Sequence, residues 1–207
     1  MSELFDDTKG DRIVRIAGND LDRRIANIVD SWPSRFQEMG FRISTGPVVT
    51  FRALEFISRE RNVDDSVPLL SMQNVRSFET VWPAKKREKD TWFRVCNDSK
   101  PLLLPVKDYL ILKRFTAKEE KRRLVAGILW AENFPFRSIG LENHLNYIYK
   151  TSGNLSKAEI YGLAALFNSA LLDRYFRTIN GNTQVNASDI RSLPLPSVSD
   201  ICAIGER

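Results

Sequence analysis

The residues with the clearest chemical potential lie in a short polar segment near the end of the chain. Residues 180–186 read NGNTQVN, so four amide side chains and a threonine surround one glycine. An amide offers a hydrogen-bond donor and an acceptor side by side, which matches the N6 and N7 edge of adenine. Helix capping explains the outer two, Asn180 and Asn186, equally well. Capping leaves three residues without a role: Asn182, Thr183 and Gln184.

Positive charge gathers between residues 85 and 123. The chain carries 31 Lys and Arg against 26 Asp and Glu, which gives a net charge of +5 and a pI near 9.3. This excess is modest, so its distribution is more informative than its size. Three solvated loops would explain the clusters, but their closeness favours a surface that binds a polyanion such as nucleic acid. The clusters are Lys85, Lys86 and Arg87, then Lys113 and Arg114, then Lys121, Arg122 and Arg123.

Motifs of cofactor-dependent enzymes are absent from the sequence. The ten glycines are scattered, with no GxG or GxxxxGK arrangement that would bring the backbone close to a nucleotide cofactor. The nearest match to the N-P-P-Y loop of amine-methylating enzymes is the segment 133–136, NFPF, whose second residue is Phe rather than Pro. We expect that segment to be an apolar loop packed on the core.

Hydrolytic chemistry has equally little support. Asp108 with Glu119, Glu120 and Lys121 has the residue types of a metal-dependent nuclease site. The two glutamates, however, lie in a charged loop in which metal ligands would be poorly held. His144 is the single histidine, and we expect it to be structural because no distinctive nucleophile accompanies it.

Cysteine usage and hydropathy indicate a protein of the cytoplasm. Cys96 and Cys202 are far apart and lack a CxxC partner, which argues against a zinc site or a disulfide framework. No window approaches the ~18 apolar residues that span a membrane, and the acidic N-terminus lacks the apolar core of a secretory signal. We divide the chain into a lead-in with a first strand (1–18), one domain (19–196) and a tail (197–207).

Two helices dominate the periodicity of the sequence. The clearer one is a long C-terminal helix over 156–178, which begins with a capping box of Ser156 and Glu159. The other covers 21–39 and is interrupted at Pro33. We further expect Asn186 to cap a short helix over 187–192, and regular structure to end at 196.

The expected strands do not alternate regularly with helices. This favours an α+β fold with a mixed or antiparallel sheet. Pro68 lacks an amide hydrogen and should lie at a sheet edge or a strand start. The predicted strands are 12–16, a hairpin over 41–51, 67–72, and an adjacent pair over 109–115 and 123–130.

Several stretches of the chain are distinctive as whole motifs. In the last third they are 140–148 (GLENHLNYI), 158–176 (AEIYGLAALFNSALLDRYF) and 180–196 (NGNTQVNASDIRSLPLP). Looser ones precede them: 44–52 (STGPVVTFR), 67–70 (VPLL) and 112–115 (LKRF). Residues 40–196 resemble the C-terminal target-recognition region of adenine-N6 DNA methyltransferases from type II restriction–modification systems. The last third is also similar to target-recognition domains in specificity subunits of type I systems.

The resemblance implies half of a two-part enzyme. In that family an N-terminal Rossmann-like domain binds S-adenosylmethionine and carries the N-P-P-Y loop, whereas the C-terminal part selects the DNA sequence. This chain matches the second part, so no cofactor is expected in it. Its expected partners are double-stranded DNA and a methyltransferase catalytic domain, in cis or as a separate chain. The open alternatives are a free-standing nuclease or methyltransferase, and a protein-docking subunit of a restriction–modification complex.

The expected DNA contacts fall into two groups, because phosphate contacts give affinity and base-edge contacts select the sequence. Motifs shared by proteins that read different sequences favour scaffold or phosphate roles, so the specifying residues are expected within 53–135. The phosphate group is Lys113, Arg114, Lys121, Arg122 and Arg123, with Lys85, Lys86 and Arg87 as a second patch. The remaining candidates are the turn of Ser44, Thr45 and Gly46, then Arg52, and finally Asn182, Thr183, Gln184 and Asn186.

Overall fold

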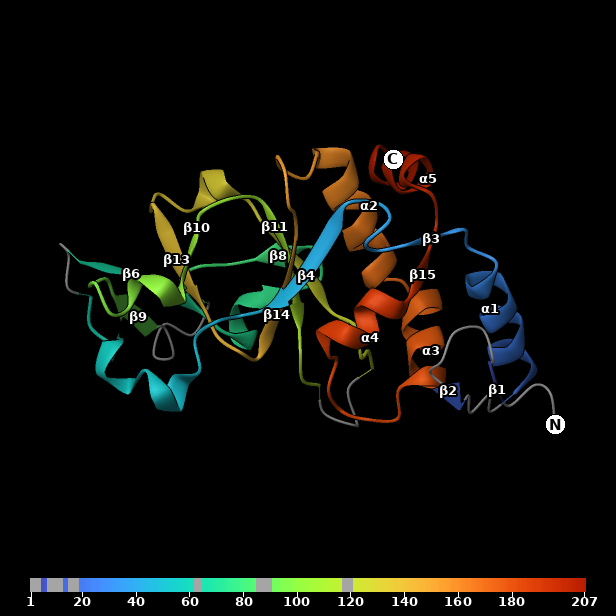
Figure 1. Ribbon diagram of the computed structural model, residues 1–207, viewed down its shortest axis with the longest axis horizontal. Helices are drawn as coiled ribbons and strands as arrows, with labels where there is room; N and C mark the ends of the chain where they lie inside the picture. Colours follow the sequence, from blue (N-terminus) through green and yellow to red (C-terminus); the bar gives the residue numbers. More distant parts are fainter. Residues whose placement is uncertain (1–4, 7–12, 15–18, 62–64, 85–90, 117–120) are drawn as a thin grey trace.

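The computed structural model describes residues 5–6, 13–14, 19–61, 65–84, 91–116 and 121–207 (Figure 1). Two β-sheets lie next to each other along the long axis, and helices gather at the end opposite the larger sheet (Figure 1). The predicted α+β class is thereby confirmed. The basic patch of Lys85, Lys86 and Arg87 lies outside the described residues.

A four-stranded antiparallel sheet forms the centre of the molecule. Its strands are β4 (Phe41–Thr45), β11 (Tyr109–Lys113), β12 (Ala126–Leu129) and β14 (Leu145–Lys150), in the order β12-β11-β14-β4. Alternation along β11 places Leu110 in the core beneath the helices and Ile111 in the core shared with the second sheet. The predicted pairing of the two strands 109–115 and 123–130 is confirmed.

The second sheet has five strands in the order β10-β13-β6-β9-β5. They are β10 (Leu103–Pro105), β13 (Ser138–Leu141), β6 (Ser66–Leu70), β9 (Thr91–Arg94) and β5 (Ile57–Ser58). β13 runs parallel to β6 and leads through a short turn into β14 of the central sheet. Leu70 and Ile139 of this sheet pack with Ile111 and Leu129 of the central one, so the two sheets share a core.

Pro68 lies in a strand that has neighbours on both sides, and the strand begins two residues before it. The prediction that Pro68 lies at a sheet edge or a strand start is therefore wrong, because β6 is an inner strand and Pro68 is its third residue. The parallel pairing with β13, however, begins only at Leu69, which lies opposite Gly140. On that side Pro68 precedes the ladder, so its missing amide hydrogen interrupts no pairing with β13.

The helices cover one face of the central sheet. They are α1 (Asp20–Asp30), α2 (Lys157–Phe167), α3 (Ala170–Ile179), α4 (Ala187–Ser192) and α5 (Val198–Gly205). Their apolar residues form the largest core cluster with those of the sheet, in which Phe36, Phe41 and Phe167 pack ring against ring. The capping box at Ser156 and Glu159 is confirmed.

The single helix predicted over 156–178 is in fact two, α2 and α3. Asn168 uses its amide to hydrogen-bond both the carbonyl oxygen and the N–H of Ala126 in β12. Ser169 then accepts a hydrogen bond from Leu172 N and begins a new helix. Both side chains compete with the helical backbone, which the apolar periodicity on either side does not reveal.

The hairpin predicted over 41–51 is also wrong. β4 forms, but its partner is β14, and Val48 instead makes a parallel bridge with Glu142. Gly46 allows this course, because a Cβ there would lie 2.2 Å from the carbonyl oxygen of Glu142. The chain therefore continues along the β13–β14 turn rather than folding back on itself.

Two further expectations about the chain's course need correction. The helix predicted over 21–39 ends at Asp30, and Ser34–Arg35 form β3, which pairs with β15 (Pro194–Leu195). Regular structure also continues past 196, because the chain forms α5. This helix packs across α2. A Cβ on Gly162 would lie 1.9 Å from the carbonyl oxygen of Ile201, so glycine lets the two helices touch.

Short elements complete the described part of the chain. The strand pairs are β1 (Phe5–Asp6) with β2 (Ile13–Val14), and β7 (Val75–Arg76) with β8 (Glu79–Thr80). The 3₁₀ turns are η1 (Thr50–Arg52), η2 (Leu54–Phe56), η3 (Met72–Asn74), η5 (Lys100–Leu102) and η6 (Ala131–Asn133). Within the described ranges, every helix is too short or too polar to cross a membrane.

An ion pair between half-buried Lys150 and buried Glu159 links β14 to the start of α2. Lys150 Nζ donates to Glu159 Oε1 at 2.6 Å, and Ser156 N donates to Glu159 Oε2 at 2.8 Å. Burial raises the pKa of the Glu159 carboxyl, but these donors outweigh burial and leave the pKa below its ordinary value. A lowered pKa stabilises the fold above the ordinary carboxyl pKa, and this stability is lost as the pH falls through the lowered value.

We expect Glu159→Gln to reduce the free energy of unfolding by about 2 kcal/mol at neutral pH, because hydrogen bonds to a charged group are lost. The reduction should shrink as the pH falls below ~4. Urea unfolding over a pH series measures both effects, with the exposed Glu132→Gln as control. A reduction that does not vary with pH would show that the charge of Glu159 contributes nothing.

Candidate functional site

Four segments that are distant in sequence meet on one side of the molecule. They are 44–46 at the end of β4, 113–116 after β11, 142–146 at the β13–β14 turn, and 183–185 before α4. We call this meeting point the loop junction. It lies on the lower side in Figure 1, with the chain around 181–184 and the end of β11. It includes seven of the candidate DNA contacts predicted from the sequence: Ser44, Thr45, Gly46, Lys113, Arg114, Thr183 and Gln184.

Asn146 cross-links three of the four segments. Its side chain is fully buried, donates from Nδ2 to the carbonyl oxygen of Val185 at 2.8 Å, and accepts from Thr45 Oγ1 at 2.9 Å. The sequence prediction missed this residue, although a polar residue at an inward position of an apolar strand was a usable signal. Thr45 is accordingly held by the fold rather than free to turn outward.

The segments 113–116 and 183–185 pair like two short strands. Val185 N donates to Arg114 O at 2.7 Å, and Thr116 N donates to Thr183 O at 3.4 Å. Phe115 and Gln184 form the antiparallel bridge between these bonds. The segment 180–186, called here the amide-rich loop, is thus fixed to the end of β11.

The side chain of Arg114 is held in place at the junction. Its Nη1 donates to the carbonyl oxygen of Asn143 at 3.0 Å, and its guanidinium lies 5.6 Å from the ring centre of Phe115. His144 packs edge-on against the same ring, with 5.1 Å between centroids. Among the described residues, Arg114 Nε has no hydrogen-bond partner although it is buried. Lys113, one residue earlier, is half-buried.

The amide-rich loop divides into structural and free side chains. Asn180 donates to Asp189 Oδ2 at 2.7 Å and to Gln184 O at 3.1 Å, and Asn186 begins α4 with its N–H bonded to Asp189 Oδ2. The predicted capping by Asn186 is thereby confirmed. The side chains that make no hydrogen bond to any described residue are those of Asn182, which is exposed, and of Thr183 and Gln184, which are half-buried.

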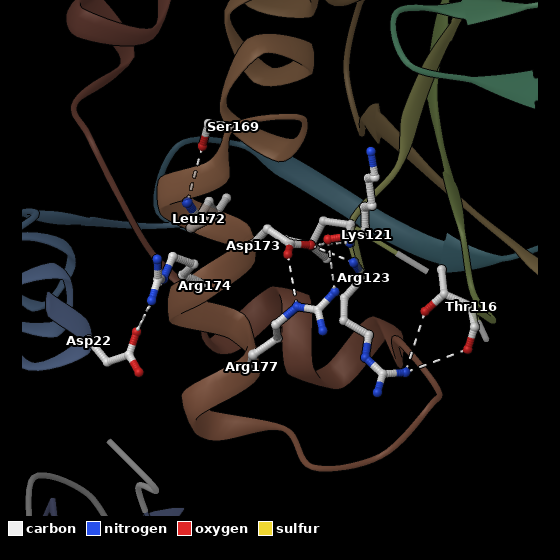
Figure 2. A network of polar contacts seen from close by, with 10 residues as sticks. Asp22, Thr116, Lys121, Arg123, Ser169, Leu172, Asp173, Arg174 and Arg177 are labelled. Atoms are coloured by element: carbon white, nitrogen blue, oxygen red, sulfur yellow. Dashed lines mark hydrogen bonds and ion pairs between the residues drawn. The ribbon is translucent and has the colours of Figure 1, made fainter. Parts of the chain in front are cut away.

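The predicted basic cluster 121–123 separates into exposed and buried parts (Figure 2). Arg123 is only 8% exposed, and its Nη1 lies 3.5 Å from both Thr116 O and Thr116 Oγ1. It is therefore not among the exposed cations of this cluster. Lys121 and Arg122 are both exposed.

Asp173 fixes the start of β12 beneath that cluster (Figure 2). Its Oδ1 accepts from the backbone N of Arg123 at 2.5 Å and of Leu124 at 2.8 Å, while its Oδ2 accepts from Arg177 Nε at 2.9 Å. Arg177 also donates to the carbonyl oxygen of Lys121 at 3.2 Å. This buried carboxylate determines where Lys121 and Arg122 emerge.

The remaining candidate DNA contacts in residues 44–52 differ in their surroundings. Ser44 Oγ lies 3.4 Å from Tyr149 Oη, and Gly46 N donates to Leu145 O at 2.8 Å. Both residues belong to the packing of the junction. Arg52 is exposed beyond it, with its guanidinium 5.3 Å from the ring centre of Phe51.

One acidic residue lies inside the junction. Glu142 Oε2 is 3.8 Å from His144 Nδ1, and burial raises the pKa of the Glu142 carboxyl. A raised pKa means that the charged carboxylate is disfavoured there. Burial of this carboxyl thus reduces the repulsion that it would exert on a polyanion at the junction.

The residues of the two enzyme hypotheses have structural surroundings in the described part of the chain. Asp108 accepts from Ala131 N at 2.8 Å, and its proposed companions Glu119 and Glu120 lie outside the described residues. Among the described residues, no three His, Cys, Asp or Glu side chains are grouped as metal ligands. Phe134 of the segment 133–136 is buried in the core shared by the sheets, as predicted for an apolar loop.

A shallow cavity of about 250 Å³ lies between β10 and β14, and Tyr149 in its lining also contacts Ser44 of the junction. Tyr109, Tyr147 and Tyr149 line it, together with Lys107 and Asp108. Burial raises the pKa of Tyr109 to about 12, so its hydroxyl stays protonated, and it donates to the carbonyl oxygen of Pro105 at 3.0 Å.

Comparison with known proteins identifies two relatives, whereas no family profile matches the chain. Over 195 residues, or 94% of its length, the chain is 36% identical to the type II methyltransferase M.PstI of Providencia stuartii. Over 170 residues, or 82%, it is 38% identical to the type II methyltransferase M.BsuBI of Bacillus subtilis. The chain spans only 38% and 34% of the lengths of these relatives. The expected similarity to type II methyltransferases is confirmed, and it concerns one part of each relative.

We expect Asn146→Ala to lower the free energy of unfolding by about 1–3 kcal/mol, because it leaves the buried carbonyl of Val185 without a donor. Thr45→Val is the matched control, since it removes the bond to Asn146 Oδ1 and keeps the bond to Val185. Hydrogen exchange at the amides of Thr116 and Val185 should accelerate in the first variant more than in the second. Equal exchange in both would show that Asn146 does not hold the loop.

Proposed function

We propose that this chain is the sequence-specific DNA-recognition part of an adenine-N6 DNA methyltransferase. The observation that carries the proposal is coverage: 94% of the chain is similar to a type II methyltransferase of which it spans only 38%. The sequence contains neither a glycine-rich cofactor loop nor an N-P-P-Y motif. Methyl transfer would therefore belong to a catalytic part that binds S-adenosylmethionine, in cis or as a separate chain.

The charges at the junction and in the neighbouring cluster 121–122 support contact with DNA phosphates. Exposed Lys121 and Arg122 and half-buried Lys113 and Arg114 come from the two chain ends that flank one loop between β11 and β12. Arg114 is already fixed by Asn143 and Phe115, so it loses little conformational entropy on binding. Phosphate contacts of this kind set affinity and register without selecting a sequence.

Sequence selection in this proposal falls to side chains that the fold leaves unused. Asn182, Thr183 and Gln184 have polar groups with no described partner, beside the cations that would hold the backbone. The side-chain amides of Asn182 and Gln184 have the donor–acceptor pair that adenine requires. The stretch 53–135, which resembles the family less closely than the last third does, supplies the remaining specifying residues.

Selection from a pool of random double-stranded DNA tests the recognition role directly. We expect the chain to enrich duplexes that share one short motif containing adenine, at low salt where binding is strongest. Recovery of duplexes with no common motif would reject sequence-specific recognition. Methyl transfer from labelled S-adenosylmethionine by the chain alone would reject the proposed division of labour.

The salt dependence of binding tests the phosphate contacts. We expect Lys121→Ala combined with Arg122→Ala to flatten the slope of log K against log salt concentration by about 2 units, since each neutralised phosphate contributes about 0.9. Fluorescence anisotropy with a labelled duplex measures the slope. The control is Arg24→Ala combined with Lys157→Ala, two exposed cations on α1 and α2. If the two double variants have the same slope, Lys121 and Arg122 do not face DNA.

A further inference from the structure

The loop that follows Val48 displays two large apolar side chains to solvent. Phe51 is 70% exposed and Leu54 is 69% exposed, the highest values among the described large hydrophobic residues. Isolated exposed hydrophobics are common on protein surfaces and need no explanation. Here, however, two of them flank Arg52 within one short loop.

The loop is anchored in the core beside these two side chains. Residues Val48, Ala53 and Phe56 anchor it in the core of the second sheet, where Phe56 packs against Phe93 with 5.8 Å between ring centroids. Its two 3₁₀ turns, η1 and η2, are closed by backbone hydrogen bonds, including Ala53 N to Thr50 O at 3.1 Å and Phe56 N to Ala53 O at 3.0 Å. The core beneath is already filled, and the exposed pair is held outward.

The root of this loop belongs to the loop junction. Val48 N donates to Leu141 O at 3.0 Å, and Asn143 N donates to Val48 O at 2.9 Å. Asn143 is also the residue whose carbonyl holds Arg114. In Figure 1 the two turns lie on the same lower side of the molecule as the junction, at the left. A duplex bound at the junction would therefore pass the tip of the loop.

We propose that Phe51 and Leu54 form an apolar wedge that enters the base stack of DNA bound at the loop junction. Apolar side chains on a rigid support are the usual means of partly unstacking a base step and kinking a duplex. The inference rests on the proposed function, because it requires DNA at the junction. Arg52, 5.3 Å from the Phe51 ring, supplies a cation where the wedge meets the backbone.

The charge of the loop separates this role from phosphate binding. Between Thr50 and Phe56 the loop carries one cation, Arg52, and one anion, Glu55, so its net charge is zero. Removing the apolar side chains should then weaken binding without changing its salt dependence. Removing the charges of Lys121 and Arg122 should instead reduce the salt dependence of binding.

A base-stacking probe tests the wedge. Duplexes that the wild-type chain binds are prepared with 2-aminopurine at successive positions, since its fluorescence rises when the base unstacks. We expect a rise at one step or two adjacent steps on binding. Phe51→Ala and Leu54→Ala should each abolish the rise and weaken binding about tenfold, with an unchanged salt slope. Phe51→Trp should retain the rise.

Exposed residues of the same types elsewhere provide matched controls. Leu21→Ala on α1 and Phe78→Ala in the β7–β8 turn remove side chains that are 50% and 47% exposed. Both should leave fluorescence and affinity at wild-type values. If the wild type binds DNA but no position brightens, or if the wedge variants behave like these controls, the wedge is rejected while the proposed function stands. If the wild type binds no DNA, the wedge and the proposed function are both rejected.

Discussion

The arrangement of the loop junction depends on one buried amide, that of Asn146. Its backbone lies opposite Thr45 in the sheet, and its side chain bonds both Thr45 and the carbonyl of Val185. A buried amide is expensive to leave half-paired, so β4, β14 and the loop before α4 must adopt one arrangement together. The exposed groups around it are displayed on a fixed support, as a binding surface needs if it is to discriminate between similar partners.

The same constraint distinguishes scaffold from surface among the predicted site residues. Thr45, Gly46, Asn180 and Asn186 meet requirements of the fold, through hydrogen bonds or close backbone approach. Arg123 is drawn inward because Asp173 holds the start of β12 against α3. The free groups are those that no fold requirement accounts for, namely Asn182, Gln184, Lys121 and Arg122.

Local chemistry could be predicted from the sequence, whereas contacts between distant segments could not. The capping box at Ser156 and the pairing of β11 with β12 follow from residues near one another in the chain, and both predictions are confirmed. The break at Asn168 depends on the backbone of Ala126, 42 positions away. The failed hairpin after β4 likewise depends on Glu142, whose carbonyl accepts only a glycine at 46. No sequence pattern within either segment indicates the distant residue that it contacts.

The exposed cations and the exposed apolar side chains lie on different supports beside the junction, and this separation has a mechanical consequence. The cations come from the chain on either side of the loop between β11 and β12, fixed to the helix core through Asp173 and Arg177. Phe51 and Leu54 are carried by the second sheet, fixed through Phe56. The core shared by the two sheets connects these parts. In the proposed complex, a duplex held electrostatically at one part would meet the apolar tip at a defined place along its length, so the fold itself would set the register between phosphate contact and base-stack contact.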